Sequence, residues 1–106
     1  MQTANYKLIV TIVSKGKAHR VVDVAHDAGA SGATVLLGHG AAVQLLLGIK
    51  VDPEKEIVYT IVEDSKAQTV LDAISQKMEL ESPHKGLAFV LSLDQVVGIT
   101  VPSSQE

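Results

Sequence analysis

The sequence predicts an α+β fold in which two strand–helix–strand units share one four-stranded antiparallel sheet, with two helices on one face. The chain has 106 residues, close to the commonest size of a single domain. Apolar runs typical of strands alternate with segments of helical period, in the order βαββαβ. Hydrophobic residues make up 46% of the chain and aromatic residues only 3%, so we expect a core of aliphatic side chains in thin layers.

In the first half, a strand, a helix and a second strand follow one another. Residues 6–13 are β-branched and almost continuously apolar, as in a strand that is buried on most of both faces. From Ala18 the apolar period is helical, and Gly29 stands where a left-handed residue is expected at the helix C-terminus. Residues 33–37 form the second predicted strand.

The second half repeats this pattern. Residues 56–62 form the third strand, and residues 65–68 have the form of a capping box that opens a helix with an apolar stripe reaching Met78. After a polar loop, residues 86–91 form the fourth strand, and a flexible tail is expected from about residue 99. Right-handed crossovers would join these elements into a ferredoxin-like βαββαβ fold, a single domain over residues 1–106.

Both faces of the predicted sheet are apolar, whereas the helices can cover only one of them. Apolar surface left in water is unfavourable, and a chain of this size has little else to cover it. We therefore expect the uncovered face to pack against other copies of the chain in an oligomer.

The composition argues against several classes of function. The net charge is −3 and aromatic residues are scarce, so nucleic acid is not an expected partner. There is no cysteine, which removes disulfides, thiolate nucleophiles and cysteine-ligated metals. No apolar run approaches the roughly twenty residues of a membrane span, and the first residues are unlike a signal peptide, so we expect a cytoplasmic protein without membrane insertion. No catalytic triad, paired carboxylate motif or P-loop is found, and an enzyme is not expected.

Three segments at the ends of predicted strands carry a family resemblance. Residues 34–40 (Thr-Val-Leu-Leu-Gly-His-Gly) close the second strand, and residues 83–90 (Pro-His-Lys-Gly-Leu-Ala-Phe-Val) lead into the fourth. Residues 53–58 (Pro-Glu-Lys-Glu-Ile-Val) lie between them. Together with the element order and the chain length, they resemble the PII family of signalling proteins, more specifically its divergent PII-like branch, over roughly residues 7–97.

The resemblance implies a homotrimeric regulatory protein that binds an adenine nucleotide (ATP, ADP or AMP) in clefts between subunits. It implies that residues 41–52 form a loop that responds to the nucleotide and docks on a protein partner, such as a membrane transporter. The nucleotide-binding residues that it implies are Ile12, Thr34, Gly38, His39, Gly40, His84, Lys85 and Gly86. The partner-binding residues are Gln44, Leu45, Leu46 and Leu47, of which the three leucines should either pack within the oligomer or meet the partner.

The sequence also departs from the family pattern. Lys85 precedes Gly86, whereas the family's phosphate loop has its lysine after the second glycine. Residues 98–100 (Gly-Ile-Thr) stand where nitrogen-sensing members carry arginines. Residues 41–52 contain neither tyrosine nor serine, so covalent modification is not expected there.

When the family resemblance is set aside, each of these segments has two possible interpretations. Glycines 38 and 40 either let a ligand approach backbone amides or form a flexible turn. Lys85 is either a phosphate-binding cation or a solvated lysine. The turn Lys15-Gly16-Lys17, which precedes a helix, either holds an anion or is solvated.

Metal binding provides the alternative function. His39 and His84 lie on loops that should approach each other, which would suit a trimeric metal-binding protein of the CutA-like type. Zinc needs about four ligands, however, and His19 and His26 are two helical turns apart. No metal site is therefore predicted.

Overall fold

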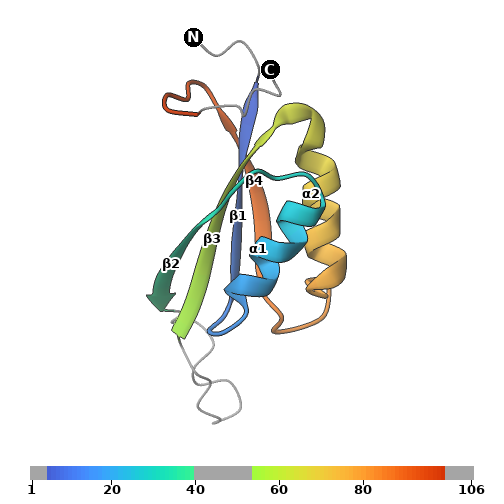
Figure 1. The fold of residues 1–106 in the computed structure, drawn as a ribbon. Coiled ribbons are helices and arrows are strands. Elements are labelled where there is room, and N and C mark those ends of the chain that lie inside the picture. Colours follow the sequence, from blue (N-terminus) through green and yellow to red (C-terminus); the bar gives the residue numbers. More distant parts are fainter. Residues whose placement is uncertain (1–4, 40–53, 100–106) are drawn as a thin grey trace.

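A computed structural model describes residues 5–39 and 54–99, and its elements follow the order βαββαβ (Figure 1). They are β1 (Tyr6–Ser14), α1 (Ala18–Asp27), β2 (Thr34–His39), β3 (Glu54–Glu63), α2 (Asp64–Lys77) and β4 (Leu87–Leu93). The strands form one four-stranded antiparallel sheet in the order β2-β3-β1-β4, and both helices lie on the same side of it. The predicted fold class is confirmed.

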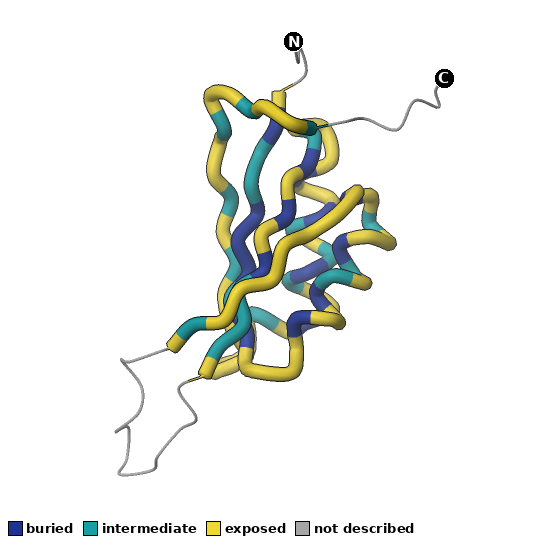
Figure 2. Tube along the Cα trace, turned by 60° about the vertical axis from the view of Figure 1, so that its left-hand side comes forward, coloured by how far each residue is buried: buried dark blue, intermediate teal, exposed yellow. Residues whose placement is uncertain are grey.

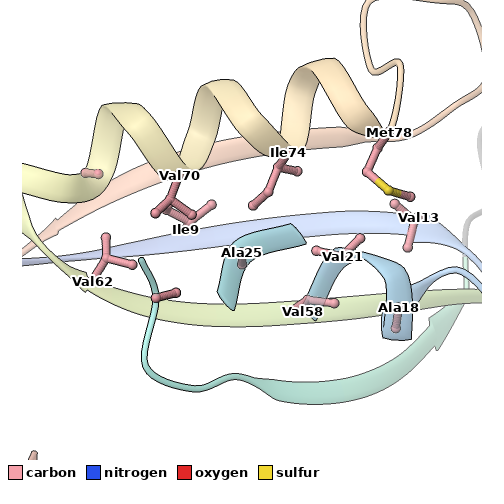
Figure 3. Packing of buried hydrophobic residues seen from close by; sticks show 12 residues of the cluster. Ile9, Val13, Ala18, Val21, Ala25, Val58, Val62, Val70, Ile74 and Met78 are labelled. Atoms are coloured by element: carbon pink, nitrogen blue, oxygen red, sulfur yellow. The ribbon is translucent and has the colours of Figure 1, made fainter. Parts of the chain in front are cut away.

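The core lies between the sheet and the helices (Figure 3). Alternate residues of a strand point to opposite faces, and the sheet contributes Ile9 and Val13 of β1 with Val58 and Val62 of β3. The helices contribute Ala18, Val21 and Ala25 from α1 and Ala67, Val70 and Ile74 from α2, followed by Met78. All of these side chains except the thioether of Met78 are aliphatic, and none is aromatic, as the composition predicts.

Neither of the two described helices lies over the other face of the sheet (Figure 1). The strand register aligns β1 residues of even number with apolar residues of β3 and β4, in rows such as Phe89–Val10–Tyr59. We call this surface the open face; its apolar residues are Leu8, Val10 and Ile12 of β1, Ile57, Tyr59 and Ile61 of β3, and Leu87, Phe89 and Leu91 of β4. Tyr59 is 42% exposed, Leu87 51% and Leu91 47%, so much of this apolar surface faces solvent in a single copy.

Several element ends differ from the predicted ones. β2 ends at His39 and β3 begins at Glu54, so the two paired strands extend about two residues further at this end than predicted. Every residue of β2 except Gly38 is exposed (Figure 2). β4 begins at Leu87, because Gly86 has a φ of +129° that does not fit a strand. The expectation at the end of α1 is confirmed, since the helix ends at Asp27 and Gly29 has a φ of +122°.

The predicted capping box at residues 65–68 is wrong. α2 begins at Asp64, its N-cap is Glu63, and no side chain makes a capping hydrogen bond there. Contacts with the start of β1 and the residue before it fix the helix start instead: the Asp64 amide donates to the Asn5 carbonyl at 2.9 Å, and Lys7 Nζ lies 3.1 Å from Asp64 Oδ1. β3 therefore runs directly into α2, and Ser65, the expected capping residue, lies inside the helix.

Two polar side chains are buried in the core. Thr11 of β1 and Thr60 of β3 are both 0% exposed, and within the described part of the chain neither hydroxyl has a hydrogen-bond partner. A buried hydroxyl without a partner is unfavourable by about 1–3 kcal/mol. These two threonines therefore lower the stability of an otherwise aliphatic core.

Thr60→Val is expected to raise the free energy of unfolding by about 1–2 kcal/mol, because valine keeps the shape and removes the unpaired hydroxyl. Urea unfolding followed by circular dichroism, at one fixed protein concentration, measures the change. Thr34→Val, at an exposed position of β2, is the matched control and should change the value by less than about 0.5 kcal/mol. A less stable Thr60→Val variant would contradict the interpretation.

Candidate functional site

Four of the residues implied by the resemblance lie at one end of the sheet, the end at which β2 stops and β3 and β4 begin (Figure 1). Ile12 of β1 pairs with Leu87, the residue that follows Gly86. Gly38 and His39 close β2, two strands away from β1. The structure therefore brings Ile12 and Gly86 together and places Gly38 and His39 at the same end, across the width of the sheet.

Gly86 is packed so closely that no other residue fits its place. A Cβ atom added there would lie 2.5 Å from the carbonyl oxygen of Ile12 and 3.1 Å from Cγ1 of Val13. Its φ of +129° is also a conformation that residues with a side chain rarely adopt. The loop before β4 is thus pressed against the backbone of β1.

The loop that joins α2 to β4 carries His84 and Lys85. His84 has a φ of +64° and Glu79 a φ of +57°, so two residues with side chains adopt the left-handed conformation in this short segment. Such conformations are unfavourable and cluster at functional loops. Nζ of Lys85 lies 3.9 Å from Oε1 of Glu79, and because both side chains are exposed this ion pair is weak. Lys85 therefore has a nearby carboxylate that the sequence analysis did not include.

Thr34 lies apart from the other implied residues. It is the first residue of β2, four positions before Gly38, which corresponds to roughly 13 Å along a strand. It borders a cavity of about 420 Å³ between the α1–β2 connection, the start of α2 and the open face. Other residues around this cavity include Ser31, Tyr59 and Lys66. Within one copy of the chain, Thr34 and Gly86 do not belong to one site.

The remaining implied residues, Gly40 and residues 44–47, lie outside the described parts of the chain. The same holds for residues 41–52 as a whole, the implied partner-binding loop. Their two attachment points are described: β2 ends at His39 and β3 begins at Glu54.

The turn Lys15-Gly16-Lys17 does surround an anionic group, and this group belongs to the protein. Oε1 of Glu56 accepts hydrogen bonds from the backbone amides of Gly16 at 2.9 Å and Ala18 at 2.8 Å. Nζ of Lys15 pairs with Oε1 of Glu54 at 3.0 Å. The turn is exposed, as one of the two interpretations expects, and the anion that its amides hold is Glu56 of β3, which caps the start of α1, an N-terminus that favours negative charge.

Sequence reasoning missed Glu56 and Lys55. Glu56 is 40 positions from Gly16, and no local pattern shows such a contact. Lys55 lies opposite Gly38 in the β2–β3 pair, and both border a smaller cavity of about 160 Å³ together with Lys15 and His39. The signal that was available for Lys55 is its place within residues 53–58, one of the three segments that carry the family resemblance.

The histidines do not converge in one copy of the chain. β3 and β1 lie between β2, which ends at His39, and β4, which His84 precedes by three residues. The approach of the two loops stays a prediction, because residues 40–53 lie outside the described parts of the chain. Within residues 5–39 and 54–99, no group of three or more histidine, cysteine, aspartate or glutamate residues is placed to hold a metal ion. The CutA-like alternative gains no support from the described residues.

None of the described helices is both long enough and apolar enough to span a membrane.

Comparison with known proteins relates this arrangement to one family. The family model of the nitrogen regulatory protein P-II matches residues 6–101. No curated protein sequence is similar enough to this chain to count as a relative.

Solved structures share the fold. GlnK of B. subtilis has a TM-score of 0.65 with 16% sequence identity, and the match covers 86% of this chain and 87% of that one. For the ATP complex of B. subtilis GlnK the TM-score is 0.67 with 14% identity, over 88% and 85% of the two chains. A Bacillus cereus protein related to NIF3 has a TM-score of 0.67 with 20% identity, and the match covers 90% of this chain but 27% of that protein.

Glu56→Ala is expected to lower the free energy of unfolding by about 1–2 kcal/mol, because the amides of Gly16 and Ala18 lose a charged acceptor. Glu54→Ala is the control, since it removes a neighbouring carboxylate whose exposed ion pair with Lys15 contributes at most about 1 kcal/mol. Chemical unfolding of the three proteins under one set of conditions makes the comparison. Equal losses in the two variants would contradict a capping role for Glu56.

Gly86→Ala is expected to lower the free energy of unfolding by about 2 kcal/mol or more, since alanine meets the Ile12 carbonyl in a disfavoured backbone conformation. Gly16→Ala is the matched control, because Gly16 also has a positive φ, of +93°, but nothing lies within 4 Å of the added Cβ. The control isolates backbone strain, about 1 kcal/mol. Thermal or urea unfolding measures the difference, and a milder effect at Gly86 than at Gly16 would refute the close packing.

Proposed function

Since the chain belongs to the nitrogen regulatory protein P-II family, we propose that it is a regulatory protein that forms a homotrimer and binds an adenine nucleotide between subunits. In this proposal, nucleotide binding changes the conformation of residues 41–52, and this loop acts on a protein partner such as a membrane transporter. The trimer, the nucleotide and the partner come from the family resemblance. The observations below support each of them.

The observation that carries the proposal is the division of the implied nucleotide-binding residues between two ends of the sheet. Ile12, Gly38 and Gly86 lie at one end, whereas Thr34 borders the cavity of about 420 Å³ nearer the other end. Between two copies of the chain, the group from one copy can face Thr34 of the other, so that one ligand contacts both. The division therefore favours a site between subunits over a site within one.

The open face supports the assembly. It is a continuous apolar surface over three strands, and its central residues include Tyr59 and Phe89, which are 42% and 40% exposed. Contiguous apolar surface of this kind marks an interaction site on a soluble protein. Burying each exposed side chain against another copy stabilises the assembly by roughly 25 cal/mol per Å² of apolar area.

The loop before β4 supports phosphate binding. Lys85 is exposed, and Gly86, without a side chain, presents an accessible backbone next to it. Lys55 adds a second cation at the same end of the sheet, opposite Gly38. Cationic donors and open backbone amides are the groups that bind phosphate oxygens. For the GlnK neighbour, the bound nucleotide is ATP.

The position of the loop's attachment points supports a signalling role. β2 ends at His39 and β3 begins at Glu54, so the two points at which the segment with residues 41–52 joins the sheet lie next to Gly38 and Lys55. A ligand that contacts these positions can have different affinities for different loop conformations, which is the thermodynamic requirement for coupling.

Isothermal titration calorimetry with ATP, ADP, AMP and cyclic AMP tests the proposal. The unmodified protein is expected to bind at least one of them with a micromolar dissociation constant, and Lys85→Ala to weaken binding about tenfold or more through the loss of a charge-assisted contact. Lys77→Ala, an exposed lysine in the last turn of α2, is the matched control and should leave binding unchanged.

Light scattering on the same samples checks the assembly, where a mass near three times 11.2 kDa is expected. A monomer would contradict the trimer. Heat from none of the four nucleotides would contradict the nucleotide site and direct the search to other anions.

A further inference from the structure

The cavity beside Thr34 has a wall formed by the end of the described chain. After β4, the chain loops outward and then returns across the top of the sheet (Figure 2). Ile99, the last described residue, reaches the cavity and lines it together with Leu8 and Ile61 of the open face. An apolar side chain from the C-terminal segment thus borders the same apolar surface that a ligand in this cavity would contact.

Residues 94–99, which we call the C-terminal strap, follow the end of β4. They contain no helix or strand, Val97 is 98% exposed, and Gly98 has a φ of +100°. Ile99 itself is half-buried. Segments with few buried contacts open at low free energy, so the strap can leave the cavity without unfolding the sheet.

The cavity has the character of a site for a flat ligand with polar edges. Its lining includes the aromatic residue Tyr59 and the polar residues Thr34, Glu63 and Lys66. An aromatic ring stacks on another ring over an apolar floor, while hydroxyl and charged groups at the rim pair with its polar edge. Ile99 and such a ring would cover overlapping parts of this apolar surface.

We propose that the C-terminal strap is an autoinhibitory lid, in which Ile99 competes with the base of the nucleotide for the cavity beside Thr34. The inference rests on the proposed function, which assigns Thr34 to nucleotide binding. Ligand binding requires the open strap, so the apparent affinity falls by the fraction of molecules in which the strap is open. The half-buried Ile99 favours the closed strap by a factor of about five to ten.

The first experiment tests the contact without any ligand. Both tyrosines of the chain, Tyr6 and Tyr59, line this cavity, and there is no tryptophan, so the intrinsic fluorescence reports on it directly. Ile99→Asn is expected to increase acrylamide quenching of this fluorescence. Val97→Asn, the matched control in the same segment, should leave quenching unchanged, because its side chain is almost fully exposed. Unchanged quenching in Ile99→Asn would overturn the lid.

The second experiment titrates ATP into the same three proteins. Asparagine is neutral, so neither substitution alters the charge that the triphosphate meets. Ile99→Asn is expected to bind ATP about five- to tenfold more tightly than the unmodified protein, and Val97→Asn with unchanged affinity. Binding that is detectable only for Ile99→Asn would also support the lid.

Two results separate this inference from the proposed function. Equal or weaker ATP binding by Ile99→Asn, with normal binding by the unmodified protein, overturns the lid and leaves the nucleotide function standing. No binding of ATP by any of the three proteins overturns the ATP site and the competition together.

Discussion

The central strand β1 pairs on both edges, with β3 and with β4, and is apolar on both faces, yet the two described helices cover only one of them. Ile9 and Val13 close the core against α1 and α2, whereas Val10 lies between Tyr59 and Phe89 on the open face. A chain of this size can bury one face of such a sheet by itself. The other face therefore determines how the molecule meets further copies, and it also forms the floor of the cavity beside Thr34.

A second set of contacts joins the strand ends near the implied nucleotide-binding residues. Gly86 is pressed against the Ile12 carbonyl, and Glu56 holds the amides of Gly16 and Ala18. The start of β3, the turn after β1 and the loop before β4 are thus fixed to one another. Because residues 41–52 attach at this end, a change at their base acts on a rigid support rather than on a flexible one.

The parts of the fold that follow from local patterns could be predicted, and the parts that depend on distant contacts could not. The hydrophobic periodicity, and the glycine, proline and polar residues that interrupt it, identify the six elements and the left-handed Gly29, because neighbouring residues alone determine them. The capping of α1 by Glu56 depends on a contact across 40 positions. The start of α2 depends on contacts with Asn5 and Lys7. The separation of Thr34 from Gly86 depends on the strand register. A local sequence pattern contains neither kind of information.

Under the proposed function, this separation links ligand binding to assembly. A nucleotide held by Gly86 of one copy and Thr34 of another binds only where two copies meet, so it stabilises the assembly by mass action, and the assembly raises its affinity in return. The C-terminal strap enters the same linkage, because Ile99 borders the open face on which the copies would pack. Displacing Ile99 would then free apolar surface at the edge of the subunit contact as well as in the cavity. Ligand, strap and neighbouring subunit therefore act on one continuous surface, which explains how a sheet with a single uncovered face can serve both assembly and binding.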